Sequence, residues 1–102
     1  MLQMIQFDGR PGNTIKLVSD DIAQDFDSEV LSSAGYSMKG AIITVEANPV
    51  RIAFGALASL TIGHLLNVGD SFRIFGNSMV GGLSYISANE GNAGILQVTP
   101  LY

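Results

Sequence analysis

The stretch from Ala41 to Gly55 constrains the fold more than any other, because two apolar-rich runs flank a single Asn48-Pro49 break. Both runs consist largely of β-branched and aromatic residues, which pack well on a pleated sheet, and Asn-Pro is a typical turn dipeptide. We therefore expect two strands joined as a β-hairpin. Period-two alternation places one set of their side chains in the core: Ile43, Val45, Ile52 and Phe54, joined later in the chain by Phe72 and Ile74.

Short runs of the same kind recur about every ten residues, separated by Gly, Pro, Asn and Asp. They predict a hairpin of strands 2–7 and 14–19, a strand at 71–75, and a hairpin of strands 83–88 and 95–99. Pro100 is expected to end the last strand, since proline has no backbone donor. Seven or eight short antiparallel strands indicate an all-β fold, a β-sandwich or jelly-roll-like barrel, built as a single domain over 1–102.

Two segments interrupt this pattern. Residues 56–66 carry many apolar residues without a clean period, and we expect an irregular connection there. Residues 20–37 form an acidic connecting segment with five of the nine acids: Asp20, Asp21, Asp25, Asp27 and Glu29. Its apolar spacing fits one or two helical turns, whereas alternation over 24–31 fits an edge strand, and residues 32–37 have loop composition. The acids favour a solvated face over a calcium site, because the glycine that an EF-hand loop needs is absent.

Composition excludes several functional classes. The net charge is −4 and the five basic residues are scattered, which argues against nucleic-acid binding. The chain has no cysteine, so disulfides and thiolate sites are excluded. No apolar run reaches the length of a membrane span, and the first residues lack the features of a signal peptide. We expect no membrane partner, no metal and no cofactor.

No arrangement of reactive residues predicts an enzyme. His64 is the only histidine, so a hydrolase triad would need it as base, yet no Gly-x-Ser-x-Gly elbow is present. A glycosidase would need two carboxylates on one concave face, and Glu46, Asp70 and Glu90 all fall at expected strand ends or turns. We expect a non-enzymatic protein, with a small hydrolase using His64 as a hypothesis to be tested by His64→Ala.

A low charge content points to a surface that is covered. Only 14% of the residues are charged, against about 25% in typical soluble domains. Apolar residues also occur on both faces of the later strands, which predicts a second buried surface and self-association. The candidate interface residues point away from the expected core or sit beside it: Ile42, Thr44, Arg51, Phe75, Met79 and Ile86.

Residues 40–55, followed by Gly63-His-Leu-Leu-Asn-Val-Gly-Asp-Ser-Phe-Arg-Ile-Phe-Gly and Leu83-Ser-Tyr-Ile-Ser-Ala, resemble small structural proteins of tailed bacteriophages. The resemblance covers residues 40–102 and implies a virion component, assembled in the host cytoplasm and present in many symmetric copies. A capsid decoration or cement protein is the first expectation, with a trimer favoured and the major capsid protein or another virion protein as partner. The alternatives are a carbohydrate-binding β-sandwich module and a tail-associated adhesion or adaptor protein.

Overall fold

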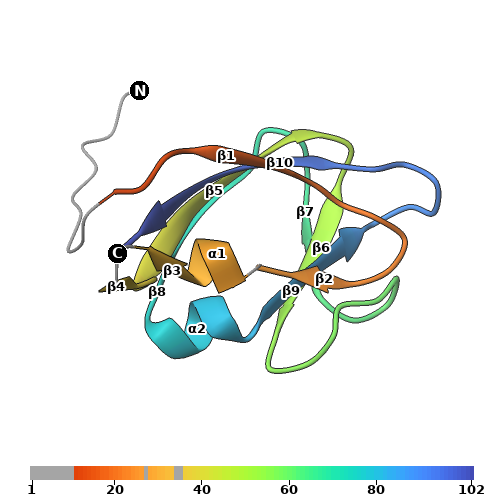
Figure 1. Ribbon diagram of the computed structural model, residues 1–102. Coiled ribbons are helices and arrows are strands. Elements are labelled where there is room, and N and C mark those ends of the chain that lie inside the picture. The colour runs from red at the N-terminus through yellow and green to blue at the C-terminus, as the bar shows by residue number, and fades with distance from the viewer. Residues whose placement is uncertain (1–10, 27, 34–35) are drawn as a thin grey trace.

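The computed structural model describes residues 11–26, 28–33 and 36–102, and about half of this part of the chain is β-strand. Two four-stranded antiparallel sheets pack face to face (Figure 1). The first sheet has the order β1-β10-β5-β8, formed by Ile15–Val18, Ile95–Leu101, Gly40–Ala47 and Ser71–Phe75. The second sheet has the order β2-β9-β6-β7, formed by Gln24–Asp25, Leu83–Ser87, Val50–Phe54 and His64–Leu66.

The strand order is that of a jelly roll. Within the described residues, every connection between successive strands of the two sheets crosses from one sheet to the other, except that β6 and β7 are neighbours in the second sheet. Two four-stranded sheets linked in this way form the two Greek keys of a jelly roll. The predicted all-β sandwich of short antiparallel strands is therefore confirmed.

Two of the predicted hairpins are wrong. β5 pairs with β10 and β8, whereas β6 pairs with β9 and β7, so the Asn48-Pro49 break is a corner between sheets. Likewise β9 and β10 belong to different sheets. Asn48 adopts a positive φ of 52°, which Asn tolerates better than most residues, and its side-chain amide donates to the Ala93 carbonyl at 2.9 Å. The two corners are thus held against each other.

The last strand runs through the proline that was expected to end it. β10 includes Pro100, whose partner on β5 is Ala41. The Pro100 carbonyl accepts from the Gly12 backbone at 2.8 Å on its other side. The backbone N and O of one strand residue point to the same side, so the Pro100 nitrogen also faces the β1 side and not β5. It lies beyond the end of β1, so no hydrogen bond of the sheet is lost because proline has no N–H.

The acidic segment contains both elements that the sequence left open. β2 is followed by a short helix, α1 (Ser28–Leu31), and then by a two-stranded hairpin of β3 (Ser32–Ser33) and β4 (Tyr36–Ser37) in place of the expected loop. A second short helix, α2 (Asn77–Gly81), was not predicted. The predicted strand 2–7 and Asp27 lie outside the described residues. In the part of the chain that is described, no helix has the length and hydropathy that crossing a membrane requires.

The core lies between the two sheets, and strand alternation explains its composition. Ala41, Ile43 and Val45 of β5 are buried, while the residues between them point outward. The predicted core residues are confirmed, with Phe54 and Phe72 partly buried against it. At one end the core is closed by side chains of α1, α2 and the segments next to them: Phe26, Val30, Leu31, Met38, Val80 and Tyr102.

The opposite end of the sandwich is closed by a network of hydrogen bonds around Gly94. The buried Ser19 hydroxyl lies 2.8 Å from the Ser87 hydroxyl and accepts from the Gly94 backbone at 2.6 Å. The Ser19 backbone in turn donates to the Gly94 carbonyl at 2.8 Å. These bonds satisfy buried polar groups of the β1–β2 and β9–β10 crossings, so these two corners between the sheets are fixed to one another.

The carboxyl-terminal Tyr102 predicts how stability depends on alkaline pH. Burial raises the pKa of its hydroxyl, which donates to the Val30 carbonyl, above the ordinary 10.0. The folded chain thus holds this proton more tightly than the unfolded chain, so the contribution to stability is complete below about pH 10 and falls as the pH rises through the folded-state pKa. Urea unfolding of Tyr102→Phe should show a loss of about 1 kcal/mol at neutral pH from the missing hydrogen bond, with a smaller alkaline decline than wild type. Equal declines in both proteins would contradict this account.

Candidate interaction surface

The segment between β6 and β7 folds back over the outer face of the second sheet. Ala58 of this loop packs on Ala53 and Ile86, and the three form a small buried cluster separate from the main core. Ile86 is 5% exposed. Its placement among the candidate interface residues is therefore wrong: its side chain points away from the core, as expected, but the loop of the same chain covers it.

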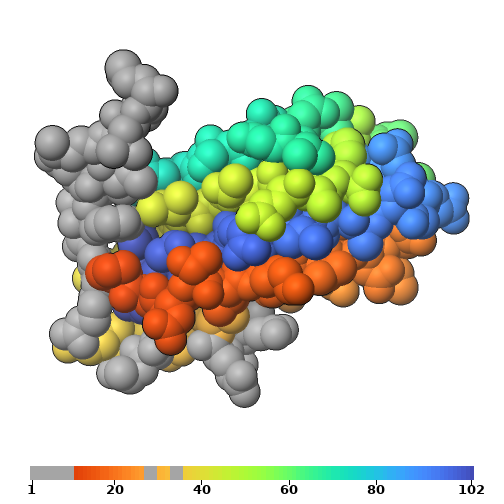
Figure 2. All heavy atoms as spheres, turned by 90° about the horizontal axis from the view of Figure 1, so that it is seen from above, coloured from red at the N-terminus to blue at the C-terminus, as the bar shows by residue number. Residues whose placement is uncertain are grey.

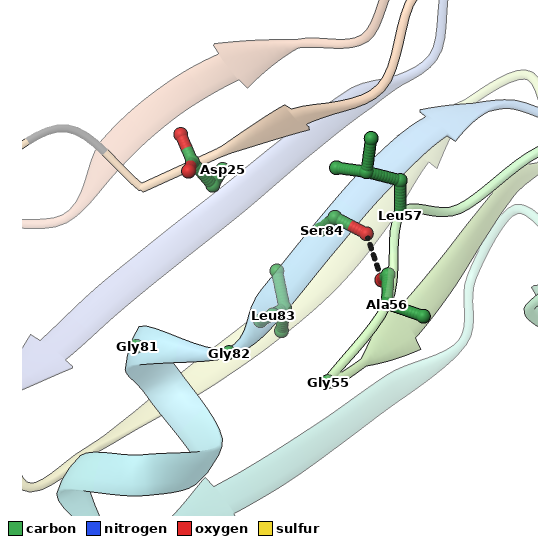
Figure 3. Close-up of a pocket in the computed structure, with 8 residues that line it drawn as sticks. All are labelled: Asp25, Gly55, Ala56, Leu57, Gly81, Gly82, Leu83 and Ser84. Atoms are coloured by element: carbon green, nitrogen blue, oxygen red, sulfur yellow. Dashed lines mark hydrogen bonds between the residues drawn. The ribbon is translucent and has the colours of Figure 1, made fainter.

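Hydrogen bonds fix this loop to the sheet along its length. The Gly55 backbone donates to the Gly82 carbonyl at 3.0 Å, and Arg51 Nη1 donates to the Gly63 carbonyl at 3.0 Å. Between these ends, the buried Ser84 hydroxyl accepts from the Ala58 backbone at 2.8 Å. It donates to the Ala56 carbonyl at 3.0 Å (Figure 3). The loop is thus hydrogen-bonded to the sheet as an ordered part of the fold, and this fixes the positions of the side chains on its outer side.

Those outer side chains are apolar. Leu57 is 74% exposed and Ile62 is 56% exposed, and Leu60 and Leu65 are each about half exposed. Leu65 belongs to β7 and points to the same side, because it pairs with Arg51, whose guanidinium bonds the loop. We call these four residues the loop face. Scattered exposed leucines are ordinary on protein surfaces, but four exposed apolar residues within nine positions of one hydrogen-bonded loop make a candidate interaction surface.

The loop face has no charge within it or beside it in sequence. From Gly55 to Gly69 the chain contains no Asp, Glu, Lys or Arg, and His64 is the only titratable residue. Exposed segments of soluble proteins usually carry charged side chains, and the cores of protein interfaces are depleted of them. Composition and exposure therefore identify the same surface.

The outer face of the first sheet, seen in Figure 2, holds three of the six predicted interface residues and is more polar. Ile42 and Thr44 are half-buried on β5, and Phe75 of β8 is 49% exposed with the Arg73 guanidinium 5.7 Å from its ring. Their neighbours form hydrogen bonds across the strands: Thr44 with Ser71, Thr14 with Thr99, and Gln97 with Glu46. This face is consequently less apolar than the loop face.

The six predicted residues do not form one surface. Met79 is exposed on α2, directly after β8, while Arg51 and Ile86 lie on the opposite sheet beneath the loop. Arg51 is half-buried, and its buried Nε atom has no hydrogen-bond partner among the residues that the structure describes. The loop face was missed, although the apolar content of residues 56–66 was the signal that could have identified it.

A groove runs beside the loop face along the outer side of β9 (Figure 3). Its volume is about 340 Å³. Asp25 of β2 and Leu57 of the loop stand on opposite sides, and Ser84 lies between them. Three glycines lie together at one end of the groove, where no side chain covers the backbone: Gly55, Gly81 and Gly82.

A second opening, of about 480 Å³, lies between the edge strands of the two sheets. β1 pairs with β10 and β2 pairs with β9. The edge strands β1 and β2 do not pair with each other, which leaves the opening between them. Its polar lining combines Lys16, Gln24, Asp25 and Tyr85.

The residues considered for catalysis are dispersed. His64 is exposed at the start of β7, Asp70 accepts a hydrogen bond from the Asn67 backbone at 2.8 Å, and Glu46 accepts from Gln97 on the first sheet. Glu90 lies in the turn after β9. Among the described residues, no three His, Asp or Glu side chains gather as a metal site would require.

Comparisons with protein-family models, with curated proteins and with solved structures find no match to this chain.

Proposed function

We propose that this chain is a non-enzymatic structural protein of a tailed-bacteriophage virion, a capsid decoration or cement protein that assembles in symmetric copies. The observation that carries the proposal is the loop face, an apolar, uncharged surface held rigidly on the outside of the sandwich. A particle component needs such a surface, since it must be covered by a neighbour after assembly.

The fold and the sequence resemblance support the same proposal from different directions. Jelly rolls occur in viral capsid proteins, and also in lectins and cupins, so the architecture alone does not specify a function. The resemblance to phage structural proteins spans residues 40–102, which include both strands bordering the loop face. Together they favour the capsid class over the others.

The energetics of the loop face suit assembly in many copies. Complete burial of a leucine or isoleucine side chain contributes about 1.5–3 kcal/mol, and association itself costs on the order of 4–15 kcal/mol. Four such side chains, already partly buried, therefore give one weak contact. Repetition of that contact around a symmetry axis, a trimer by expectation, and over a particle surface makes the assembly stable through avidity.

Two measurements test the virion role. The gene is expected to lie beside genes for capsid, portal or tail proteins, and mass spectrometry of the purified particles should detect the chain in many copies. Absence of the chain from particles purified to constant composition would overturn the proposal. Its presence only in the lysate supernatant would have the same meaning.

Carbohydrate binding is a second candidate, favoured by the polar opening between β1 and β2. Lys16, Gln24 and Asp25 supply the hydrogen-bond donors and acceptors that sugar hydroxyls can pair with. Binding on a glycan array that is lost on Gln24→Ala would support this candidate. A silent array would remove it and leave the virion role unaffected.

A further inference from the structure

The groove beside the loop face has an uneven distribution of charge. Asp25 is exposed on its rim, and within the described part of the chain its carboxylate has no hydrogen bond or ion pair. The other lining residues are uncharged: Gly55, Ala56, Leu57, Gly81, Gly82, Leu83 and Ser84. The groove thus offers one carboxylate opposite an apolar wall (Figure 3).

Several polar groups on the floor of the groove are already bonded within the chain. The Ser84 hydroxyl is occupied by the loop, accepting from Ala58 and donating to Ala56. The Gly55 N–H and the Gly82 carbonyl are bonded to each other. Gly81 has only open space where a side chain would stand, so a ligand can approach the backbone there. The Asp25 carboxylate, the apolar surface of Leu57 and the open backbone at Gly81 remain for recognition.

From this arrangement we infer that the groove binds an arginine side chain, flanked by apolar residues, from the protein that covers the loop face. Arginine has an apolar stem that can lie along Leu57 and a planar guanidinium that pairs with a carboxylate through two hydrogen bonds. The rigid fork of donors on the guanidinium matches the geometry of a carboxylate, which the compact ammonium group of lysine does not. The partner is therefore a chain segment of the form apolar-arginine-apolar. This inference rests on the proposed role of the loop face in assembly.

The test uses a peptide, so that it does not depend on assembly. The ¹⁵N-labelled full chain is titrated with the capped tripeptide Leu-Arg-Leu, and with Leu-Gln-Leu as the uncharged control. We expect saturable shifts of the backbone amides of Gly55, Gly81, Gly82 and Ser84. The arginine peptide should bind roughly two- to fivefold more tightly than the glutamine peptide, as an exposed ion pair predicts, and added salt should reduce this difference.

Two variants separate the Asp25 carboxylate from the general negative charge of the protein. Asp25→Asn should abolish the preference for arginine, while Glu90→Gln, at an exposed acid in the turn after β9, should preserve it. Equal affinities of the two peptides for wild type, shifts at other residues, or an unchanged preference in Asp25→Asn would each overturn the inference. None of these results bears on whether the chain is present in virions, so the two proposals fail separately.

Discussion

Replacement of Gly94 by alanine is expected to destabilise the protein by about 3 kcal/mol, the upper part of the range for overpacking a tight site. A Cβ atom at this position would lie 2.5 Å from Val50 Cγ1 and 2.7 Å from the Asn48 carbonyl oxygen. Both distances are far below van der Waals contact. Relief would require the corner between β5 and β6 to move, although it is bonded to the neighbouring corner through Asn48.

Chemical denaturation of Gly94→Ala gives the change in unfolding free energy. Gly81→Ala is the matched control, since Gly81 has ordinary φ and nothing within 4 Å of its added Cβ. The control is expected to lie within about 1 kcal/mol of wild type, on the stabilising side. Equal stability of Gly94→Ala and wild type would show that the corners at this end are not packed together.

Removal of the Ile86 side chain should have the second largest effect, because it links the fold to the loop face. Ile86→Ala leaves a cavity between the second sheet and the loop, beneath Ala58. The expected loss is about 2–3 kcal/mol, at the lower end of the range for buried isoleucine because the loop can settle. Hydrogen exchange of the Ala58 amide, which donates to Ser84, should accelerate as the loop loosens.

The control for this variant is Ile22→Ala, which removes the same atoms from a side chain that is 74% exposed. It should change stability by no more than about 0.5 kcal/mol. If Ile86→Ala behaved like Ile22→Ala, with unchanged exchange at Ala58, the loop would not depend on its buried cluster. The rigid presentation of the loop face would then be contradicted.

Strand positions could be predicted from the sequence because alternation is local. β8 was predicted at its observed bounds, and β1, β9 and the inward residues of β5 and β6 were nearly so. Strand pairing could not, because a corner between sheets and a hairpin have the same local pattern. One residue in the turn did argue against a hairpin. Proline at position 49 cannot adopt the positive φ that both central residues of a type I′ hairpin need.

The candidate site was predicted only in part, for a related reason. Alternation correctly placed Ile42, Phe75 and Ile86 on outward faces. Whether an outward face meets solvent depends on what folds over it, which is a tertiary property. The loop covers Ile86 and exposes its own Leu57 and Ile62. The exposed apolar surface therefore lies on the loop and not on the sheet, where it was predicted.

The most direct test of the account is the solution mass of the 10.8 kDa chain, measured by light scattering from micromolar to millimolar concentration. Wild type should rise to a multiple of the monomer mass, and Leu57→Ser/Ile62→Ser should remain monomeric with an unchanged fold. The control Val18→Ser/Ile22→Ser, which removes exposed apolar side chains elsewhere, should behave as wild type. A monomeric wild type throughout, or assembly that survives the loop-face changes and is lost on Phe75→Ser, would contradict the assignment of the loop face as the assembly surface.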